Sequence, residues 1–238
     1  MGSIADTTQA VAPRVHEVRN LTDSTYVVRF DRNAMEFEPG QYVSVGIRGD
    51  INMREYSIYS PVHADYLEIL VKEVREGYVS KQLRAVEPGD ELEVDGPFGF
   101  FLIDEPMRRR ELLFIATGTG ISPFHCFAGS YPDLSYTLIH GVRTAAERYE
   151  HGAYEATRVT TCLSRDPEAC SAAGGDTRGR GATPLIVPGR VTDFLRGHPV
   201  GPDTLCYLCG NCDMIYESFD ILKEHGVPPE QLYAEVYF

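Results

Sequence analysis

The stretch "ELLFIATGTGISPF", residues 111–124, decides the fold class of this chain. It opens with a nearly continuous apolar run, which is typical of a strand buried on both faces of a parallel sheet. A glycine loop follows, and Pro123 then suits the first turn of a helix. Four later segments, "SYTLIHG", "ATRVTTCLS", "TLCYLCG" and "QLYAEVYF", repeat the strand pattern at intervals that leave room for helices. We therefore predict a Rossmann-like parallel α/β domain over residues 105–238.

The residues before this domain follow a different pattern. The segments "RVHEVRNL", "TYVVRFD", "QYVSVGI", "REYSIYS" and "LEILVKEV" are short, alternate with polar residues and are bounded by turn residues. We predict an antiparallel β-barrel over residues 12–104, interrupted by one helix at residues 80–86. Residues 1–11 are expected to form a disordered leader, since they lack the features of a signal peptide. A biased segment, residues 166–189, is predicted to be a mobile loop.

Charge and cysteine use narrow the class of protein. The net charge of −13 disfavours a nucleic-acid binder, which needs a basic surface to neutralise phosphates. No apolar run approaches the roughly 20 residues of a membrane span. The six cysteines all fall in the second half of the chain, so no disulfide framework covers it. A reducing cytoplasm is the expected location.

The glycine loop "ATGTGISPF", residues 116–124, has the pattern G-x-G-x-x-P. Two glycines let the backbone approach a ligand, and the helix start beyond them offers N–H groups and a partial positive charge to a phosphate. A tight strand-to-helix turn with no ligand is the alternative. The position at the carboxyl end of the first parallel strand, where such folds bind ligands, favours a nucleotide.

The barrel contains two further features suited to phosphate. In "REYSIYSP", residues 54–61, Arg54 and Tyr56 share one strand face and could hold a phosphate and stack on a planar ring. An ordinary amphipathic strand is the alternative. In "EGYVSKQL", Gly77 precedes the helix and Ser80 is a candidate N-cap. Together the two features indicate a cofactor with a diphosphate.

The order R-x-Y-S, G-x-x-S, G-T-G-x-x-P, C-G-x-x-x-M and a terminal aromatic residue resembles the ferredoxin–NADP reductase family. The resemblance runs from about residue 12 to residue 238. "GFFLIDE", residues 99–105, and "AEVYF", residues 234–238, are most similar to the bacterial ferredoxin/flavodoxin–NADP reductases. This resemblance implies a barrel that binds FAD and an α/β domain that binds NADPH.

The resemblance also implies the site residues, by matching position. The catalytic residues would be Ser57, Cys209, Glu235 and Tyr237. The FAD site would contain Arg54, Tyr56, Ser57, Leu70, Val71, Gly77, Val79, Ser80, Thr119, Tyr237 and Phe238. The NADPH site would contain Thr117, Gly118, Thr119, Gly120, Arg143, Ser164, Arg165, Arg190, Cys209, Gly210, Asn211 and Met214. The ring of Tyr237 would stack on the flavin and gate access to it, unless the terminal aromatics are simply core residues.

Three arginines bear on the choice of nicotinamide cofactor. A 2′-phosphate needs cationic partners, and arginine binds it bidentately. Arg165 follows a predicted parallel strand, and Arg143 and Arg190 match basic positions of the bacterial type. Asp166 follows directly and weakens this argument. We expect NADPH rather than NADH.

The resemblance implies hydride transfer from NADPH to FAD and single-electron transfer between the flavin and ferredoxin or flavodoxin, by a monomeric enzyme. Such acidic partners would dock on a local basic patch, for which Arg75, Lys81, Arg84 and Arg108 are candidates; a merely solvated surface is the alternative.

Two alternative functions stay open at this point. The first keeps the same fold: an NADH-dependent flavin reductase, or the reductase component of an oxygenase. The second is a non-enzyme: a nucleotide-sensing module or a subunit of a larger complex.

Three cysteines in "LCYLCGNCDM", residues 205–214, have the spacing C-x-x-C-x-x-C, which suggests a cluster or a redox pair. However, Cys206 and Cys209 are three residues apart on a predicted strand and therefore face opposite sides. Cys212 falls in the following turn or helix start, and no fourth ligand has usable spacing. We interpret the segment as part of the nicotinamide site, with Cys209 as its functional sulfur and no metal.

Overall fold

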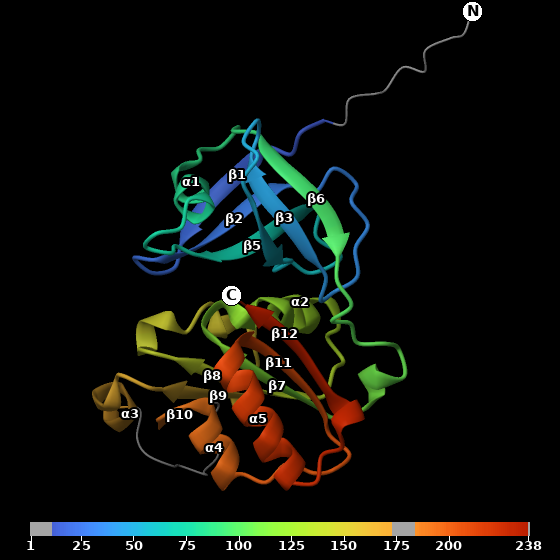
Figure 1. Ribbon diagram of the computed structural model, residues 1–238, viewed down its shortest axis with the longest axis vertical. Helices are drawn as coiled ribbons and strands as arrows, with labels where there is room; N and C mark the ends of the chain where they lie inside the picture. The colour runs from blue at the N-terminus through green and yellow to red at the C-terminus, as the bar shows by residue number, and fades with distance from the viewer. Residues whose placement is uncertain (1–10, 173–183, 238) are drawn as a thin grey trace, which may run out of the picture.

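The computed structural model describes residues 11–172 and 184–237, and Figure 1 shows two stacked halves. The upper half consists of two three-stranded antiparallel sheets, in the orders β1-β2-β5 and β4-β3-β6. Its strands are β1 (Val15–Asn20), β2 (Thr25–Asp31), β3 (Tyr42–Ile47), β4 (Met53–Ser57), β5 (Tyr66–Lys72) and β6 (Leu92–Phe98), with helix α1 (Val79–Ala85). The prediction of an antiparallel barrel is confirmed.

The lower half is a six-stranded sheet in the order β10-β9-β8-β7-β11-β12, and all its pairings are parallel. Its strands are β7 (Leu112–Thr117), β8 (Tyr136–Val142), β9 (Val159–Leu163), β10 (Leu185–Pro188), β11 (Leu205–Asn211) and β12 (Leu232–Tyr237). Its helices are α2 (Ser122–Ser130), α3 (Pro167–Ala172), α4 (Val191–Gly197) and α5 (Cys212–Glu224). Short 3₁₀ helices are η1 (Met107–Arg109), η2 (Gly118–Ile121), η3 (Ala145–Glu147), η4 (His151–Ala153), η5 (Ala156–Arg158) and η6 (Pro229–Gln231).

Strand β7 is buried on both faces, as its apolar run predicts. Phe114 packs in the core layer that faces α2 and the barrel, whereas its neighbours Leu113 and Ile115 pack toward α4 and α5. Alternate side chains of one strand thus serve two layers. Because β7 pairs with β8 on one side and β11 on the other, the carboxyl ends of these three strands meet at one edge of the sheet.

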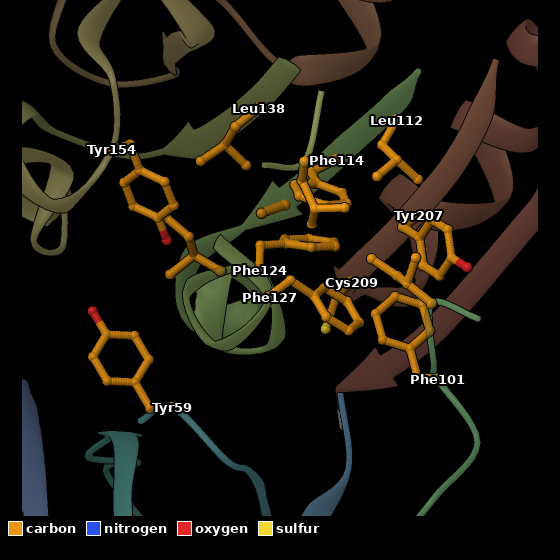
Figure 2. Close-up of a cluster of buried hydrophobic side chains, with 14 of the residues drawn as sticks. Tyr59, Phe101, Leu112, Phe114, Phe124, Phe127, Leu138, Tyr154, Tyr207 and Cys209 are labelled. Carbon is orange, nitrogen blue, oxygen red and sulfur yellow. The ribbon is translucent and has the colours of Figure 1, made fainter. Parts of the chain in front are cut away.

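One aromatic cluster joins the two halves. Figure 2 shows Tyr59 of the barrel facing a group of side chains from α2 and the parallel sheet. Phe114 and Phe124 stack with ring centroids 4.7 Å apart, and Phe101, on the connection between the halves, meets Tyr207 edge to face at 5.3 Å. This shared core fixes where the barrel sits over the carboxyl ends of the strands.

Two details of the sequence prediction are wrong. Helix α1 spans residues 79–85, and its N-cap is Tyr78 rather than Ser80. Within the predicted loop over residues 166–189, α3 forms at one end and β10 pairs with β9 at the other. The apolar run of β10 adds a sixth strand to the sheet, an interaction that local composition does not reveal. Residues 173–183 of that segment and residues 1–10 of the leader lie outside the described part of the chain.

Candidate active site at the junction of the barrel and the parallel sheet

The glycine loop after β7 is held tightly against β11. Gly118 has φ of +54°, a left-handed conformation that favours glycine. A Cβ on Gly120 would lie 2.3 Å from the carbonyl oxygen of Cys209, so only glycine permits this approach. Gly120 is therefore a packing residue behind the loop, whereas Thr117, Gly118 and Thr119 line an open cleft.

The end of β11 is fixed to the same loop by a small polar network. Gly210 has φ of +127°, and a Cβ there would lie 2.4 Å from the Thr117 hydroxyl. The backbone N–H of Asn211 donates to that hydroxyl over 3.0 Å. The Asn211 side chain in turn accepts a hydrogen bond from the N–H of Met214 and caps α5. Two strand ends thus form one rigid rim.

The cleft above this rim has a volume of about 650 Å³. It gathers most of the residues expected to bind NADPH, including all three arginines: Thr117, Gly118, Thr119, Arg143, Ser164, Arg165, Arg190, Gly210, Asn211 and Met214. Of the expected set, Gly120 and Cys209 are not in the lining; both are buried behind it. The three guanidinium groups give part of the cleft a positive potential suited to phosphates.

Several lining residues were missed by sequence reasoning. They include Lys72, Gly141, Glu147, Thr192, Asp213 and Glu217. Gly141 carried a readable signal, because a glycine at the end of an apolar strand marks a close approach; a Cβ there would lie 2.5 Å from Val191. Lys72 carried none. It ends β5 in the barrel and reaches across to Glu147, with its ammonium nitrogen 2.9 Å from the carboxylate.

Next to Tyr237, which lines the cleft, β4 and β12 bring three side chains from distant parts of the chain into contact. The Ser57 hydroxyl donates to a carboxylate oxygen of Glu235 over 2.5 Å, and the Tyr237 hydroxyl donates to Ser57 over 2.7 Å. The side chain of Cys209 lies beside the Tyr237 hydroxyl and interacts with it. Because β11 and β12 pair in parallel, Cys209 is directly opposite Glu235. The structure therefore brings all four expected catalytic residues together.

Burial controls the protonation of this group. Desolvation raises the pKa of Glu235 to about 7, although the hydrogen bond from Ser57 opposes the shift. Burial also raises the pKa of the Cys209 thiol well above its usual value, so the sulfur is a neutral thiol rather than a nucleophilic thiolate. The hydroxyl of Tyr237 stays protonated for the same reason. Glu235 is thus the group of the four that can gain or lose a proton near neutral pH.

The barrel residues expected to hold FAD divide between exposed and buried positions. Arg54 is exposed on β4, with its guanidinium donating to the carbonyl oxygen of Met53, and Tyr56 is half buried. Near α1, the side-chain oxygen of Gln82 and one guanidinium nitrogen of Arg84 are buried, with no hydrogen-bond partner in the described part of the chain. The exposed guanidinium of Arg54 can donate to a diphosphate, whereas the unpartnered oxygen of Gln82 can only accept and would not bind one.

Other expected FAD contacts are constrained by the fold. Leu70 faces the core shared by the two halves, whereas Val71 faces the barrel core and could offer a ligand only its backbone. The Ser80 hydroxyl accepts a hydrogen bond from the N–H of Val74, which closes the turn before α1. Gly77 packs against that same hydroxyl, and Val79 is buried. Phe238 lies outside the described residues.

The cations proposed for docking are not equivalent. Arg84 lies near Glu73 and over the ring of Tyr26. Arg108 stacks on Tyr131 and donates to the carbonyl oxygen of Ile103, so it fastens the connection between the two halves. The two remaining candidates, Arg75 and Lys81, are exposed.

The three late cysteines separate as the strand geometry predicts. Cys206 packs with α4 and α5 on one face of the sheet, Cys209 packs on the other face, and Cys212 opens α5. Among the described residues, no group of three or more His, Cys, Asp or Glu side chains is placed to hold a metal ion. The same residues contain no helix long and apolar enough to cross a membrane.

Comparisons with known proteins agree with this geometry. Residues 13–103 match the family model of the oxidoreductase FAD-binding domain. The chain is 31% identical over 229 residues to the flavodoxin/ferredoxin–NADP reductase of Escherichia coli (strain K12), covering 87% of this chain and 88% of that one. It is 27% identical over 239 residues to the toluate 1,2-dioxygenase electron transfer component of Pseudomonas putida, covering 94% of this chain and 66% of that one.

A solved structure shows the same fold. A ferredoxin NADP+ reductase from Neisseria gonorrhoeae with bound FAD and NADP superimposes with a TM-score of 0.79 at 21% identity, covering 96% of this chain and 98% of that one. The barrel, the parallel sheet and the site at their junction define an FAD-dependent oxidoreductase. The chain belongs to the ferredoxin/flavodoxin–NADP reductase family.

Proposed function

We propose that this enzyme passes electrons between NADPH and a ferredoxin or flavodoxin by way of FAD. The observation that carries the proposal is the hydrogen-bonded series of Tyr237, Ser57 and Glu235, in which Tyr237 lines the cleft that also holds the three arginines. A barrel side chain and two residues of the terminal strand meet where a flavin and a nicotinamide would have to meet.

The chemistry that FAD would supply when bound is hydride acceptance and single-electron release. Arg54, Tyr56 and the segment around Gly77 would hold it on the barrel. Ser57 and Glu235 position polar groups at the junction, and their mutual hydrogen bond fixes both side chains. The ring of Tyr237 covers this point and would have to move before a nicotinamide could enter, so it gates access. Cys209, a neutral buried thiol, packs against Tyr237 and would act through its shape rather than through a charge.

Arginine placement supports NADPH over NADH. Arg143, Arg165 and Arg190 approach the cleft from the ends of β8 and β9 and the start of α4, with the hydroxyl-bearing Ser164 beside them. A 2′-phosphate would find several cationic donors there, whereas the ribose hydroxyl of NADH would leave them without an anion.

The test is to measure kcat/KM with NADPH and NADH for the wild-type enzyme and for Arg165→Ala. We expect wild type to prefer NADPH, and the variant to lose about tenfold with NADPH but little with NADH, as for one lost charge-assisted contact. Arg109→Ala is the matched control, because Arg109 is exposed and pairs only with exposed Glu105 among described residues. Equal efficiency with both cofactors would contradict the assignment.

Exposed Arg75 and Lys81 support electrostatic docking of an acidic carrier on the barrel. Because the whole chain carries a net charge of −13, only a local cationic surface could attract such a partner. The rate of ferredoxin reduction should therefore fall as the salt concentration rises, while the rate with a neutral dye stays constant.

We propose that the enzyme acts as a monomer in the cytoplasm, where its six free cysteines stay reduced.

An NADH-dependent flavin reductase or the reductase component of an oxygenase is the second candidate. The similarity to a dioxygenase electron transfer component over 94% of the chain favours it. A preference for NADH would support this candidate, as would purification without bound flavin. Reduction of ferricyanide by the isolated chain with added FAD, driven by NADPH or by NADH, would separate both enzymes from a nucleotide-sensing module or an inactive subunit of a complex.

A further inference from the structure

A pair of buried histidines lies directly behind the glycine loop. His140, on β8, is fully buried, and its Nε2 is 2.8 Å from the carbonyl oxygen of Gly118. Its Nδ1 is 2.8 Å from Nε2 of His151 in η4. Neither ring is in the lining of the cleft, but Gly118 is. The histidines therefore touch the candidate site through its backbone.

The two histidines form a series of hydrogen bonds that ends at the Gly118 carbonyl oxygen on one side and at Arg148 on the other. The groups at these two ends determine which nitrogen of each ring carries the proton. The carbonyl oxygen of Gly118 can only accept, so Nε2 of His140 carries the hydrogen and Nδ1 must accept. Nε2 of His151 then donates to it, which leaves Nδ1 of His151 as an acceptor. That atom lies 3.3 Å from Nε of Arg148, a group that can only donate. One arrangement of neutral rings satisfies the whole series.

Burial preserves this arrangement. Desolvation lowers the pKa of His140 to about 4. Desolvation, the neighbouring ring and Arg148 lower the pKa of His151 to about 2. Both rings are thus neutral at physiological pH, which the series of hydrogen bonds requires.

The hydrogen bond from His140 also determines the direction of the next backbone N–H, which belongs to Thr119. In a planar trans peptide the carbonyl oxygen and the following N–H point in opposite directions. Because His140 holds the oxygen of Gly118 behind the loop, the N–H of Thr119 must point away from His140. Within the described part of the chain, this N–H has no hydrogen-bond acceptor outside its own short helix. Gly118 has a left-handed backbone and open space at its Cβ position, so apart from the short helix η2 that it begins, the contact that holds its carbonyl oxygen is the one with His140.

We propose that His140 is a positioning residue for the nicotinamide nucleotide, which orients the Gly118–Thr119 peptide so that its N–H is offered to an acceptor oxygen of the bound cofactor. His151 and Arg148 support it by fixing its tautomer. This inference rests on the proposed function, because it takes the cleft to bind NADP+ or NADPH.

Two substitutions separate the two nitrogens of His140. In His140→Gln the side-chain amide nitrogen reaches the position of Nε2 and can still donate to Gly118. In His140→Asn the shorter amide can still accept from His151 but cannot reach Gly118. The readouts are the Kd of NADP+ by titration calorimetry on the FAD-loaded protein, the FAD content and the thermal midpoint.

We expect His140→Asn to raise the Kd by about tenfold and His140→Gln to raise it by less than about threefold, with FAD content unchanged in both. At saturating NADPH, kcat should stay within about twofold of wild type, because the loop binds and does not react. Equal Kd values for the two variants, while wild type binds NADP+, would overturn the role of His140 alone. Failure of the wild-type protein to bind NADP+ would overturn the proposed function and this inference together.

A measurement on the wild-type protein keeps the inference testable if His140→Asn does not fold. The ¹⁵N chemical shifts of the His140 ring should show a protonated Nε2 and an unprotonated Nδ1, and the Thr119 amide resonance should shift when NADP+ binds. The opposite tautomer, or an unchanged Thr119 resonance at saturating NADP+, would overturn it.

Discussion

Single side chains at the junction act as one hydrogen-bonded series. Tyr237 donates to Ser57, and Ser57 donates to Glu235, so each group restricts the next. The hydroxyl of Ser57 is the central member and the one contributed by the barrel. Its removal should disturb the geometry of hydride transfer more than the binding of either cofactor.

Replacement of Ser57 by valine tests this role. We expect Ser57→Val to slow flavin reduction by NADPH by about tenfold or more, without release of FAD, because the bound geometry loses its central hydrogen bond. Stopped-flow absorbance of the flavin measures the rate. Ser57→Thr is the matched control, since threonine has nearly the shape of valine but keeps the hydroxyl. Equal rates for the two variants would refute the role.

The raised pKa of Glu235 predicts a pH-dependent stability. Its folded-state pKa of about 7 exceeds the ordinary value of 4.5, so the folded state binds the proton more tightly than the unfolded state does. This contribution is fully present below about pH 4.5 and is lost as pH rises through about 7. Glu235→Gln, which cannot ionise, should therefore be more stable than wild type at pH 8.5 by about 1–3 kcal/mol. At pH 4.5 the two should differ little.

Thermal midpoints of wild type and Glu235→Gln at the two pH values measure the effect. A midpoint difference that does not change with pH would show that the carboxyl group titrates normally. The same pair of proteins gives the pH dependence of kcat, where the variant should lose any transition near pH 7 that belongs to this group.

At the scale of elements, the site depends on how closely β7, η2 and β11 approach one another. Sequence reasoning identified the glycines of this region from the G-x-G-x-x-P and C-G-x-x-x-M patterns. It could not assign Gly120 to packing and Gly210 to a contact with Thr117, because each partner comes from another strand. The same limit hid β10, whose apolar run becomes a strand only by pairing with β9.

Gly210→Ala tests the close approach, with Gly226→Ala as its control. Both glycines have positive φ, +127° and +89°, so both substitutions should cost about 1–2 kcal/mol of backbone strain. A Cβ on Gly226 meets nothing within 4 Å, whereas one on Gly210 overlaps the Thr117 hydroxyl. We expect urea unfolding to show a total loss of about 3 kcal/mol or more for Gly210→Ala only. Equal losses would show that the approach is not tight.

At the scale of the molecule, polar contacts reinforce the shared aromatic core of Figure 2. Glu150, which has φ of +47°, accepts hydrogen bonds from Arg19 and from the hydroxyl of Tyr59, both in the barrel. Arg19 also pairs with buried Glu68. A second bridge, Lys72 to Glu147, crosses at the cleft itself. We propose that these bridges hold the FAD-binding half, residues 12–104, in a fixed position relative to the nucleotide-binding half, residues 105–238.

Glu150→Gln should weaken the contact between the two halves and lower the stability of the protein. The substitution keeps the shape but removes the charge from three partly buried hydrogen bonds with Arg19 and Tyr59, and we expect a loss of about 1–3 kcal/mol. Glu155→Gln is the control, because its ion pair with Arg158 is largely exposed and should contribute less than about 1 kcal/mol. Calorimetric unfolding measures both. A Glu150→Gln loss no larger than that of the control would show that the bridge does not hold the halves together.

The sequence by itself determined the two-part fold, because apolar periodicity and turn residues are local signals that survive without knowledge of contacts. It also determined the chemical types in the site, through the spacing of R-x-Y-S, the glycine loop and the terminal "AEVYF". Only the tertiary structure decided which of these residues meet. Ser57 and Tyr237 are 180 positions apart, and Lys72 and Glu147 are 75 apart. Such contacts, and the burial that raises the pKa of Glu235, exist only after the barrel packs on the sheet.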